Sequence, residues 1–583
     1  MCGIVGYVGR RSAAPVLLSG LKKLEYRGYD SAGVAVLHDG IFDVVKRKGR
    51  VWELDGAERL HGKIGIGHTR WATHGEPSER NAHPHLYGKF AVVHNGIVEN
   101  FHALKEECLL RGEIFSSDTD SEIIAHLVSR YYDGDFLKAV FLALSRLVGS
   151  YAIAALCLDV PDRMIVARMK SPLIVGVGEG ETIVASDLPA VAGMGIETYS
   201  LSDGELAEVS ADGALFYDCN LAPIKKERIA YSSEEETPTT GAFPHFMFKE
   251  IFEIPTAVAR TLTTQFPPAL TEILRKVDRI EIAACGTAYH SGISAKYAIE
   301  SLARVPVSVH VASEFRYSDP ILTENTLVIA VSQSGETADT IAAAQLAKER
   351  NVTVLAITNV FASSLTETAD FTLYTRAGCE IAVAATKSFN AQLALLYLFA
   401  CRLAQAKGRP AADTQSLVNA VTKTLQASQG VAAWAKYFTD AKSVYFLGRG
   451  ADFGTAVEGS LKLKEISYLP GEGYPAGELK HGTLALVGEE TPVVVILTQR
   501  AIAEKTMNAV HETQARGATV FLITSLEEYA AATEHVLLIP QCTECFSPIL
   551  SVIPLQLLAY HTAVAMGRDP DKPRNLAKSV TVE

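Results

Sequence analysis

The sequence has few of the features that mark membrane, secreted or nucleic-acid-binding proteins. No run of about 18 apolar residues occurs in its 583 residues, so we expect no transmembrane helix. The first residues carry no basic stretch followed by an apolar one, so no signal peptide is expected. Basic residues are the minority, with 54 Lys and Arg against 66 Asp and Glu, a net charge of −12. This balance argues against a nucleic acid or an anionic membrane as the main partner.

Cysteine is also scarce. The nine cysteines are scattered among strand-like segments, which indicates a reduced, cytoplasmic protein. Cys542 and Cys545 have the spacing of metal ligands, but no second Cys or His pair follows them, so we expect two ordinary thiols and no metal. Apolar residues make up 48% of the chain and charged residues 21%, a balance that excludes disorder and predicts a buried core.

The first part of the chain, residues 1–230, has short apolar segments separated by Gly-rich turns. Strands are predicted at 3–8, 90–94 and 151–156, and a helix at 121–132. We therefore expect an α+β domain with mostly antiparallel strands. Residues 231–245 are polar and poor in large apolar side chains, and they are predicted to form a linker.

After the linker, apolar strands alternate with helices, which is typical of a parallel sheet covered on both faces. The candidate strands are 279–284, 326–331, 353–358, 443–447, 492–497 and 519–524. The segment that begins at Leu327 recurs at Val493, 166 positions later, and both copies continue into a second apolar strand. We therefore predict two doubly wound α/β subdomains, 246–420 and 421–583, which bind ligands at the carboxyl ends of their strands.

A candidate nucleophile stands at the start of the chain. Cys2 follows the initiator Met directly, and removal of that Met would give Cys2 a free α-amine with a pKa near 7.7–8.0. Such an amine can accept the thiol proton, so one residue would supply both nucleophile and base, as in N-terminal nucleophile hydrolases. Taken alone, a cysteine at position 2 is more often an inert terminal residue.

Other residues in this part of the chain would suit an amino-acid amide as substrate. Arg70 could pair with its carboxylate and Asp120 with its ammonium group. Asn95 and Gly96 could donate N–H groups to a tetrahedral oxyanion. Each has a simpler explanation on its own: a surface charge, a helix cap and a tight turn.

Together, these motifs resemble a known family. Cys2-Gly3-Ile4-Val5-Gly6, Tyr26-Arg27-Gly28-Tyr29-Asp30-Ser31, His68-Thr69-Arg70-Trp71-Ala72-Thr73-His74-Gly75 and His94-Asn95-Gly96 are similar to class II glutamine amidotransferases, and specifically to the isomerising glutamine–fructose-6-phosphate aminotransferases. The resemblance implies that Cys2 is the nucleophile and that Asn95 and Gly96 form the oxyanion hole. It also implies glutamine binding by Arg70, Trp71, Thr73, His74, Gly96 and Asp120, with Trp71 as the gate of an ammonia channel.

A second candidate site follows a strand of the first repeat. Ser332-Gln333-Ser334-Gly335-Glu336-Thr337 offers hydroxyls, successive N–H groups and a helix N-terminus, which together could hold an anion. It has neither a Walker lysine nor dinucleotide Gly spacing, which disfavours a nucleotide. Simple helix capping is the alternative. Thr287 follows another strand and could add a hydroxyl.

The C-terminal half resembles the sugar-isomerase (SIS) half of the same family, and residues 573–583 match its C-terminal signature. The resemblance implies binding of the sugar phosphate by Thr287, Ser332, Gln333, Ser334, Thr337 and Val383. Lys578 would form a Schiff base with fructose 6-phosphate, and Glu465, with Lys462 nearby, would move a proton between C1 and C2. His481 would assist ring opening from the neighbouring subunit, which implies a homodimer. No cofactor is implied.

Two departures from the family pattern stand out. Ala288 occupies a position where we expect Ser, and Ala384-Ala385 lies in a loop where Ser is usual. Neither removes a catalytic candidate. The resemblance therefore implies a bifunctional, glutamine-dependent synthase of glucosamine 6-phosphate. A related enzyme acting on another sugar phosphate, or a regulator that only senses sugar phosphates, are the alternatives. The Lys578, Glu465 and His481 set argues against a sensor.

Overall fold

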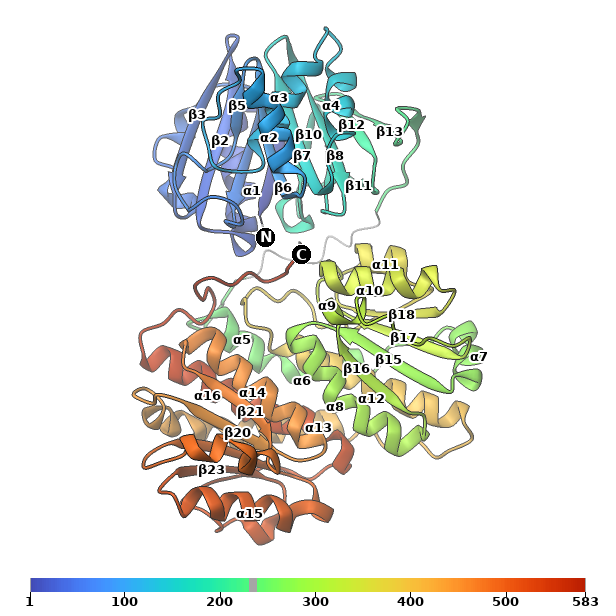
Figure 1. Ribbon diagram of the computed structural model, residues 1–583, viewed down its shortest axis with the longest axis vertical. Coiled ribbons are helices and arrows are strands. Elements are labelled where there is room, and N and C mark those ends of the chain that lie inside the picture. Colours follow the sequence, from blue (N-terminus) through green and yellow to red (C-terminus); the bar gives the residue numbers. More distant parts are fainter. Residues whose placement is uncertain (1, 230–238, 582–583) are drawn as a thin grey trace. The chain divides into compact units, whose positions relative to one another are not determined.

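The computed structural model describes residues 2–229 and 239–581, which form two compact units (Figure 1). The first comprises the chain up to Pro238 together with the C-terminal residues from Ala577. The second runs from Thr239 to Leu576. Most of the predicted linker, residues 231–238, lies outside the described part of the chain.

Two seven-stranded sheets form the first unit, and every strand pairing in them is antiparallel. The first sheet, in spatial order, is β11 (Glu197–Ser200), β9 (Ile174–Gly178), β10 (Glu181–Ala185), β1 (Gly3–Gly9), β4 (Ile64–Arg70), β2 (Ser31–His38) and β3 (Ile41–Lys48). The second is β14 (Pro223–Ile224), β13 (Gly213–Tyr217), β12 (Leu206–Ser210), β8 (Val160–Met169), β7 (Gly149–Cys157), β6 (Phe90–Val98) and β5 (His85–Tyr87).

The two sheets pack face to face, with a helical layer outside each. Ile4 and Ile66 of the first sheet share one apolar core with Val93 and Val166 of the second. Helix α1 (Ala13–Leu24) covers the outer face of the first sheet. The outer face of the second is covered by α2 (Phe101–Leu110), α3 (Glu122–Tyr131) and α4 (Phe136–Leu144). The α+β prediction is confirmed, and α3 is the helix expected at 121–132.

The second unit contains two five-stranded parallel sheets of identical topology. The first is ordered β16 (Val307–Val311), β15 (Arg279–Ala284), β17 (Thr326–Val331), β18 (Thr353–Thr358) and β19 (Phe371–Tyr374). The second is ordered β21 (Gly471–Pro475), β20 (Val444–Gly448), β22 (Pro492–Leu497), β23 (Thr519–Thr524) and β24 (His535–Leu538). The repeat therefore marks a duplicated α/β subdomain, as the sequence predicts.

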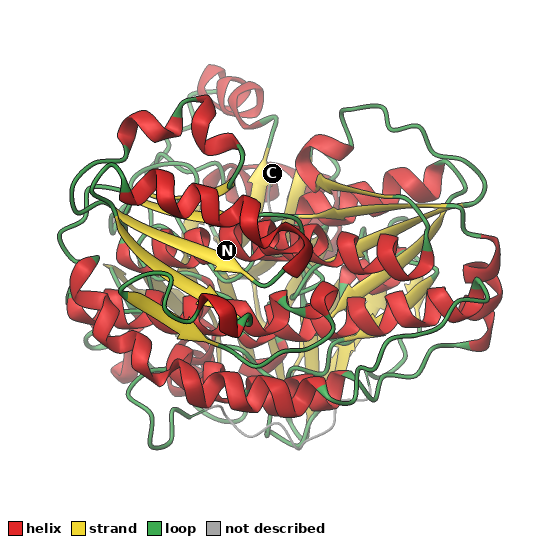
Figure 2. Ribbon diagram, turned by 90° about the horizontal axis from the view of Figure 1, so that it is seen from below, coloured by secondary structure: helices red, strands yellow, loops and turns green. Residues whose placement is uncertain are grey.

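Helices flank the strands of this unit (Figure 2). They are α5 (Phe246–Phe252), α6 (Ile254–Thr261), α7 (Pro268–Lys276), α8 (Gly286–Ala303), α9 (Ala312–Phe315), α10 (Ala338–Glu349), α11 (Ser364–Thr368), α12 (Lys387–Ala406), α13 (Leu417–Ala427), α14 (Ala451–Ser467), α15 (Ala503–Gln514) and α16 (Pro548–Ala565). A single apolar core runs through α8, α12, α14 and α16 and joins the two sheets.

Helices α8 and α14, one from each repeat, pack closely because of a glycine. A Cβ built on Gly454 of α14 would lie 2.1 Å from Ser294 Oγ of α8, so no larger residue fits there. This close approach brings the polar side chains of the two helices together one turn farther along.

One helical stretch of the described chain, Glu544–Ala565, is long and apolar enough to cross a membrane by length and composition alone. Within its most apolar window, 83% of the residues are buried inside the fold. The stretch contains α16, which contributes to the core shared by the two sheets.

Candidate active sites

Cys2 lies immediately before β1, next to the end of β4. The β1–β4 pairing sets Gly3 opposite Thr69, which places Cys2 beside Arg70 and Trp71. The backbone N–H of Trp71 donates to Cys2 Sγ at 3.2 Å. Burial raises the pKa of the Cys2 thiol, while the Trp71 hydrogen bond and the charge of Arg70 act in the opposite direction.

Asn95 and Gly96 lie on β6, close to the main chain of Cys2. Asn95 Nδ2 donates to Cys2 O at 3.0 Å. Gly96 has a φ of +133°, and a Cβ at this position would lie 2.0 Å from Ser150 O, so only glycine fits. The amide N–H of Asn95 therefore lies against the main chain of Cys2, the residue that carries the candidate nucleophile.

Arg70 ends β4 and is buried, with only 3% of its surface exposed. Its guanidinium donates to the carbonyl oxygens of His74, Gly75 and Glu76, so it holds the following loop in place. Burial lowers the pKa of Arg70, an effect opposed by the negative charges of Cys2, Asp120 and Asp30. Arg70 is therefore close enough to Cys2 and to Asp120 for their charges to affect its pKa.

The remaining predicted glutamine contacts lie around this centre. Asp120 is buried just before α3, and its Oδ2 accepts a hydrogen bond from Val98 N at 2.8 Å. Trp71, Thr73 and His74 follow β4 in the irregular loop that Arg70 binds. The indole of Trp71 meets the ring of Tyr29 edge-on, with centroids 6.0 Å apart.

The predicted sugar-phosphate loop joins β17 to α10. Ser332 Oγ lies 2.8 Å from Thr337 Oγ1 and accepts from Gly335 N at 3.0 Å. Ser334 Oγ accepts from the N–H of Glu336 at 3.1 Å. Gly335 has a φ of +66°, and a Cβ there would lie 2.0 Å from Ser363 Oγ. The loop is therefore a tight turn with its hydroxyls gathered at the carboxyl edge of the sheet, where Gln333 also lies.

A buried cluster of charged side chains lies between α8 and α14. Lys462 Nζ is 2.5 Å from Glu465 Oε2, 3.4 Å from Glu458 Oε1 and 3.0 Å from Thr287 Oγ1, to which it donates. Thr287 in turn donates to Glu458 Oε1 at 3.1 Å. Burial opposes the charge of Lys462, but the two carboxylates outweigh it and hold the pKa of Lys462 above its usual value.

This cluster joins the two repeats at one edge. Ala284 and Val331 are paired across β15 and β17, so Thr287 and the Ser332 loop leave the sheet at neighbouring positions. The second unit thus brings Thr287, Lys462 and Glu465 together beside the predicted phosphate loop. The side chain of Glu465 is 20% exposed, whereas that of Lys462 is fully buried.

Three further predicted residues lie outside helices α8 and α14. His481 is exposed, at the end of a short 3₁₀ segment, Glu478–His481. Val383 lies in the loop before α12, where its N–H donates to Asp571 O at 3.0 Å. Lys578 belongs to the first compact unit, in the tail that begins at Ala577. The roles assigned to these residues therefore stay predictions.

Two histidines of these sites were missed by the sequence reasoning. His290 Nδ1 lies 2.8 Å from Glu458 Oε2, one turn after Thr287 on α8. His68 Nε2 lies 3.0 Å from Asn95 Oδ1. Alternation gave a usable signal for His68, because residues 68 and 70 of a strand share a face.

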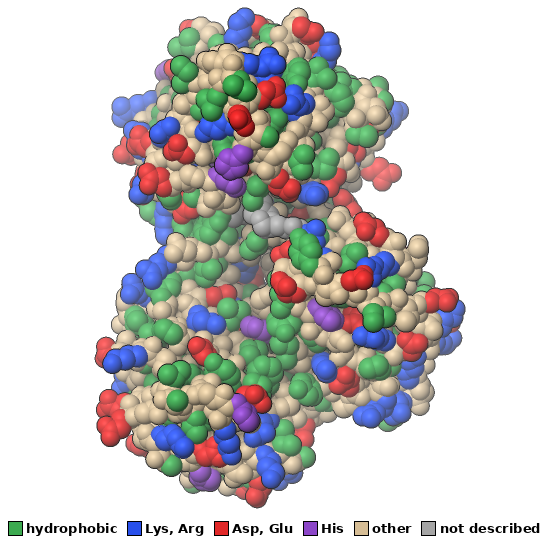
Figure 3. Space-filling view, in the orientation of Figure 1, with side chains coloured by type: hydrophobic (Ala, Val, Ile, Leu, Met, Phe, Trp, Pro, Cys, Tyr) green, Lys and Arg blue, Asp and Glu red, His purple; other side chains and the backbone are tan. Residues whose placement is uncertain are grey.

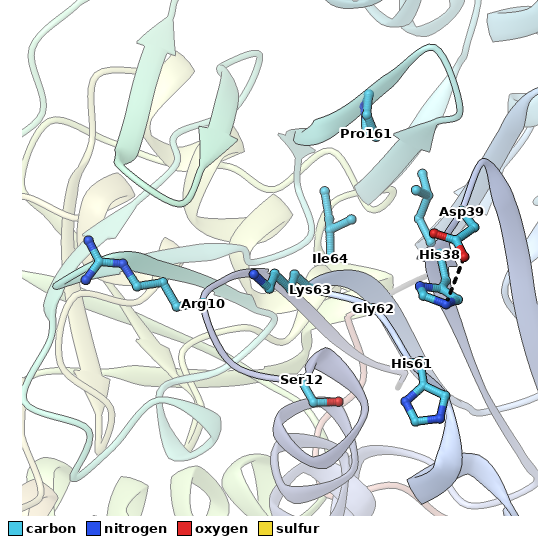
Figure 4. Close-up of a pocket in the computed structure, with 10 residues that line it drawn as sticks. Arg10, Ser12, His38, Asp39, His61, Gly62, Lys63, Ile64 and Pro161 are labelled. Atoms are coloured by element: carbon cyan, nitrogen blue, oxygen red, sulfur yellow. Dashed lines mark ion pairs between the residues drawn. The ribbon is translucent and has the colours of Figure 1, made fainter.

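A separate shallow pocket lies on the first unit (Figure 4). Arg10, His38, His61 and Lys63 line it together with Asp39. None of the predicted glutamine residues does, and the predicted reaction does not use this pocket. Elsewhere, basic and acidic side chains are intermixed on the visible face of each unit (Figure 3), in keeping with a net charge spread along the chain.

The family models that match this chain assign the two candidate sites to different domains. A glutamine amidotransferase domain model matches residues 68–193. A SIS domain model matches twice, at 273–402 and 437–566. These two matches cover both parallel sheets, one for each copy of the repeat.

The chain is also similar to proteins of known structure. The C-terminal domain of a glucosamine-fructose-6-phosphate aminotransferase from Francisella tularensis aligns with a TM-score of 0.54 at 37% identity, over 57% of this chain and all of that one. A glucosamine-6-phosphate deaminase from Thermotoga maritima aligns with a TM-score of 0.50 at 27% identity, over 58% of this chain and all of that one.

Curated relatives match from end to end. The glutamine–fructose-6-phosphate aminotransferase (isomerizing) of Caldanaerobacter subterraneus is 47% identical over 608 aligned residues that cover both chains completely. The protein of the same name from Aquifex aeolicus is 45% identical over 592, again covering both chains. With this identity along its full length, and with both halves in the same order, the chain belongs to the family of isomerising glutamine–fructose-6-phosphate aminotransferases.

Proposed function

We propose that this protein makes glucosamine 6-phosphate and glutamate from fructose 6-phosphate and glutamine. The observation that carries the proposal is the presence, in one chain, of two groups of side chains: Cys2 with the Asn95 amide, and the Lys462–Glu465 pair beside a hydroxyl-rich loop. The product is an amino sugar phosphate, the kind of compound from which nucleotide amino sugars are built.

Glutamine hydrolysis is assigned to the first unit. The Cys2 thiolate attacks the side-chain amide carbon, and Asn95 with Gly96 stabilises the oxyanion. Ammonia leaves as the tetrahedral intermediate collapses to a thioester, which water hydrolyses to glutamate and free Cys2. Arg70 and Asp120 hold the α-carboxylate and α-ammonium groups, supported by Trp71, Thr73 and His74. Since the guanidinium of Arg70 already binds three carbonyl oxygens of the 71–76 loop, glutamine binding and the position of this loop are linked.

Isomerisation is assigned to the second unit and the C-terminal tail. Ser332, Gln333, Ser334 and Thr337, with Thr287 and Val383, hold the sugar phosphate. Lys578 forms an imine with the C2 carbonyl and releases water. Ammonia from glutamine then replaces the Lys578 nitrogen at C2 and frees the lysine, and Glu465 moves a proton from C1 to C2, which gives the aldose. Lys462, with its raised pKa, keeps a positive charge next to Glu465 and so favours the carboxylate form that accepts a proton.

We further propose a glutaminase domain at 1–230, a linker at 231–245 and SIS subdomains at 246–420 and 421–583. The enzyme works as a homodimer in which His481 enters the partner's sugar site, an arrangement supported by the exposure of His481. It works in the cytoplasm, which its nine free cysteines support.

Product analysis tests the proposal directly. The purified full-length protein is incubated with glutamine and fructose 6-phosphate, and glutamate and hexosamine phosphate are quantified. We expect glutamate and glucosamine 6-phosphate in equal amounts. If no amino sugar forms from fructose 6-phosphate but one forms from another ketose phosphate, the protein is a related enzyme of different specificity. Binding of sugar phosphates without turnover would indicate a sensor.

A further inference from the structure

We propose that His68 is a positioning residue that orients the amide of Asn95 for oxyanion binding. The inference rests on the proposed glutaminase reaction and adds to it a residue that does not touch the substrate. His68 lies on β4, two residues before Arg70, and it is fully buried. His68 contacts the proposed oxyanion hole through the side chain of Asn95.

The hydrogen-bond pattern fixes the proton on His68. Nε2 lies 3.0 Å from two oxygen atoms, the backbone carbonyl of His94 and Oδ1 of Asn95. The His94 carbonyl can only accept, so Nε2 must carry a hydrogen and donate it. Nδ1 is buried and has no hydrogen-bond partner among the described residues, which suits an unprotonated nitrogen.

The same pattern fixes the amide of Asn95. Nδ2 donates to Cys2 O at 3.0 Å, and Oδ1 accepts from His68. Reversing the amide would bring Asn95 Oδ1 against the carbonyl oxygen of Cys2 and turn the NH₂ group toward the N–H of His68. Both contacts would then be repulsive, so His68 allows a single orientation, in which the NH₂ group faces the main chain of Cys2.

The surroundings of His68 keep it neutral and dry. The His83 ring stacks on it with centroids 4.0 Å apart and planes 11° apart. His83 Nδ1 accepts from the N–H of His94 at 3.2 Å, so His83 is also held in place. Burial lowers the pKa of His68 to about 3, and the charge of Arg70 acts in the same direction. The donor is therefore neutral throughout the physiological pH range.

Loss of this donor should be felt in the transition state. Without it, Oδ1 of Asn95 is buried with one partner fewer, and the amide can rotate away from the oxyanion position. Removal of an oxyanion-hole donor elsewhere costs about 10²–10³ in kcat, and misorientation should cost part of that. Ground-state binding of glutamine does not depend on the oxyanion, so KM should change little.

The test compares three substitutions in the full-length protein. His68→Gln can place an amide N–H near the former Nε2, whereas His68→Asn reaches only the former Nδ1 position and His68→Leu has no donor. We expect His68→Gln to keep most of the glutaminase kcat. The Asn and Leu variants should lose about 10–100-fold in kcat, with KM within about threefold of the original.

A double-mutant comparison separates positioning from general damage. In an Asn95→Ala background there is no amide to orient, so adding His68→Leu should lower the glutaminase kcat further by less than about threefold. His85→Gln is the matched control, because His85 is an equally buried histidine whose Nε2 lies against Thr119 Oγ1 and not Asn95. It should leave kcat within about twofold. Equal losses for His68→Leu in both backgrounds would overturn the inference.

A second readout does not depend on activity. In full-length protein labelled with ¹⁵N-histidine, His68 should show a protonated Nε2 and an unprotonated Nδ1 from pH 5 to 8. A protonated Nδ1 would contradict the inference even in a fully active enzyme. Retention of this tautomer in a protein that failed to hydrolyse glutamine would reject the proposed function while leaving the orientation of Asn95 intact.

Discussion

The backbone N–H of Trp71 donates a hydrogen bond to the thiol sulfur of Cys2 at 3.2 Å. The proposed nucleophile and the proposed channel gate are thus joined directly, without an intervening side chain. The gate residue also begins the loop whose carbonyl oxygens bind Arg70. A change at the thiol or at the carboxylate clamp can therefore move Trp71.

Processing at the N-terminus is required if Cys2 is to serve as its own base. We expect the initiator Met to be absent from active enzyme and Cys2→Ala to abolish glutamine hydrolysis. Cys2→Ser should be severely impaired, because an alcohol is a much weaker nucleophile than a thiol near neutral pH. Intact-mass spectrometry and a glutamate assay check both points. Full activity with Met1 retained would reject the shared-base mechanism.

Trp71 should be needed for ammonia transfer and not for hydrolysis. A bulky apolar ring can close a narrow passage and exclude the water that would protonate ammonia. We expect Trp71→Ala to keep its glutaminase activity but to form less glucosamine 6-phosphate per glutamate released, with both substrates saturating. Trp52→Ala is the matched control, since Trp52 is 59% exposed in the same unit. If Trp71→Ala still forms one glucosamine 6-phosphate for each glutamate released, Trp71 has a packing role only and does not gate ammonia.

The central strands could be predicted closely from the sequence because buried strands have a locally apolar composition. β15, β17, β18, β22 and β23 are largely apolar and almost entirely buried, and their observed bounds coincide with the predicted ones. Edge strands such as β16 and β24 were not predicted. Their side chains are partly exposed. β24 has only four residues and no alternation, whereas β16 does alternate, as Val-Ser-Val-His-Val, but over only five residues.

The site was only partly readable for a similar reason. The Glu458, Lys462 and Glu465 set was visible because helical spacing places the three on one face. The contacts of Glu458 with His290, and of Asn95 with His68, join residues far apart in the sequence. No local pattern encodes such pairs, since they depend on how strands and helices pack.

Acid should destabilise the fold through buried histidines of the first unit. Burial lowers the pKa of His68, His83, His85 and His94. With folded pKa values below the unfolded value near 6.5, stability is complete above that pH and falls as the pH drops. Below that pH, each histidine that stays neutral in the fold lowers the free energy of unfolding by up to about 1.4 kcal/mol per pH unit. Urea unfolding should show a clear loss from pH 7.5 to 5.5.

A ring substitution provides the control for this pH effect. His83→Phe keeps a flat ring against His68 but cannot take up a proton in the unfolded state. It should reduce the slope of stability against pH by the contribution of one histidine. Unchanged stability of the original protein between pH 7.5 and 5.5 would show that these histidines are not neutral in the fold.

Removing the buried lysine should damage both stability and isomerisation. In Lys462→Met, Glu458 stays fully buried without its positive partner, and losses of about 3–5 kcal/mol are typical of such broken pairs. Lys464→Met is the matched control, because Lys464 is exposed on the same helix. Adding Glu458→Gln to Lys462→Met should restore part of the stability measured in urea. Equal stability of the two single variants would contradict a charged cluster.

The last prediction concerns Lys578. Its neutral amine should add to the C2 carbonyl of fructose 6-phosphate and release water, forming an imine that borohydride reduces to a stable secondary amine. Peptide mass spectrometry should then find the sugar phosphate on Lys578. Lys578→Met should give no adduct and no amino sugar but retain glutaminase activity, while Lys572→Met, a lysine in the same tail, should still be labelled at Lys578. An adduct on any other lysine would move the imine elsewhere, and activity in Lys578→Met would remove it from the reaction.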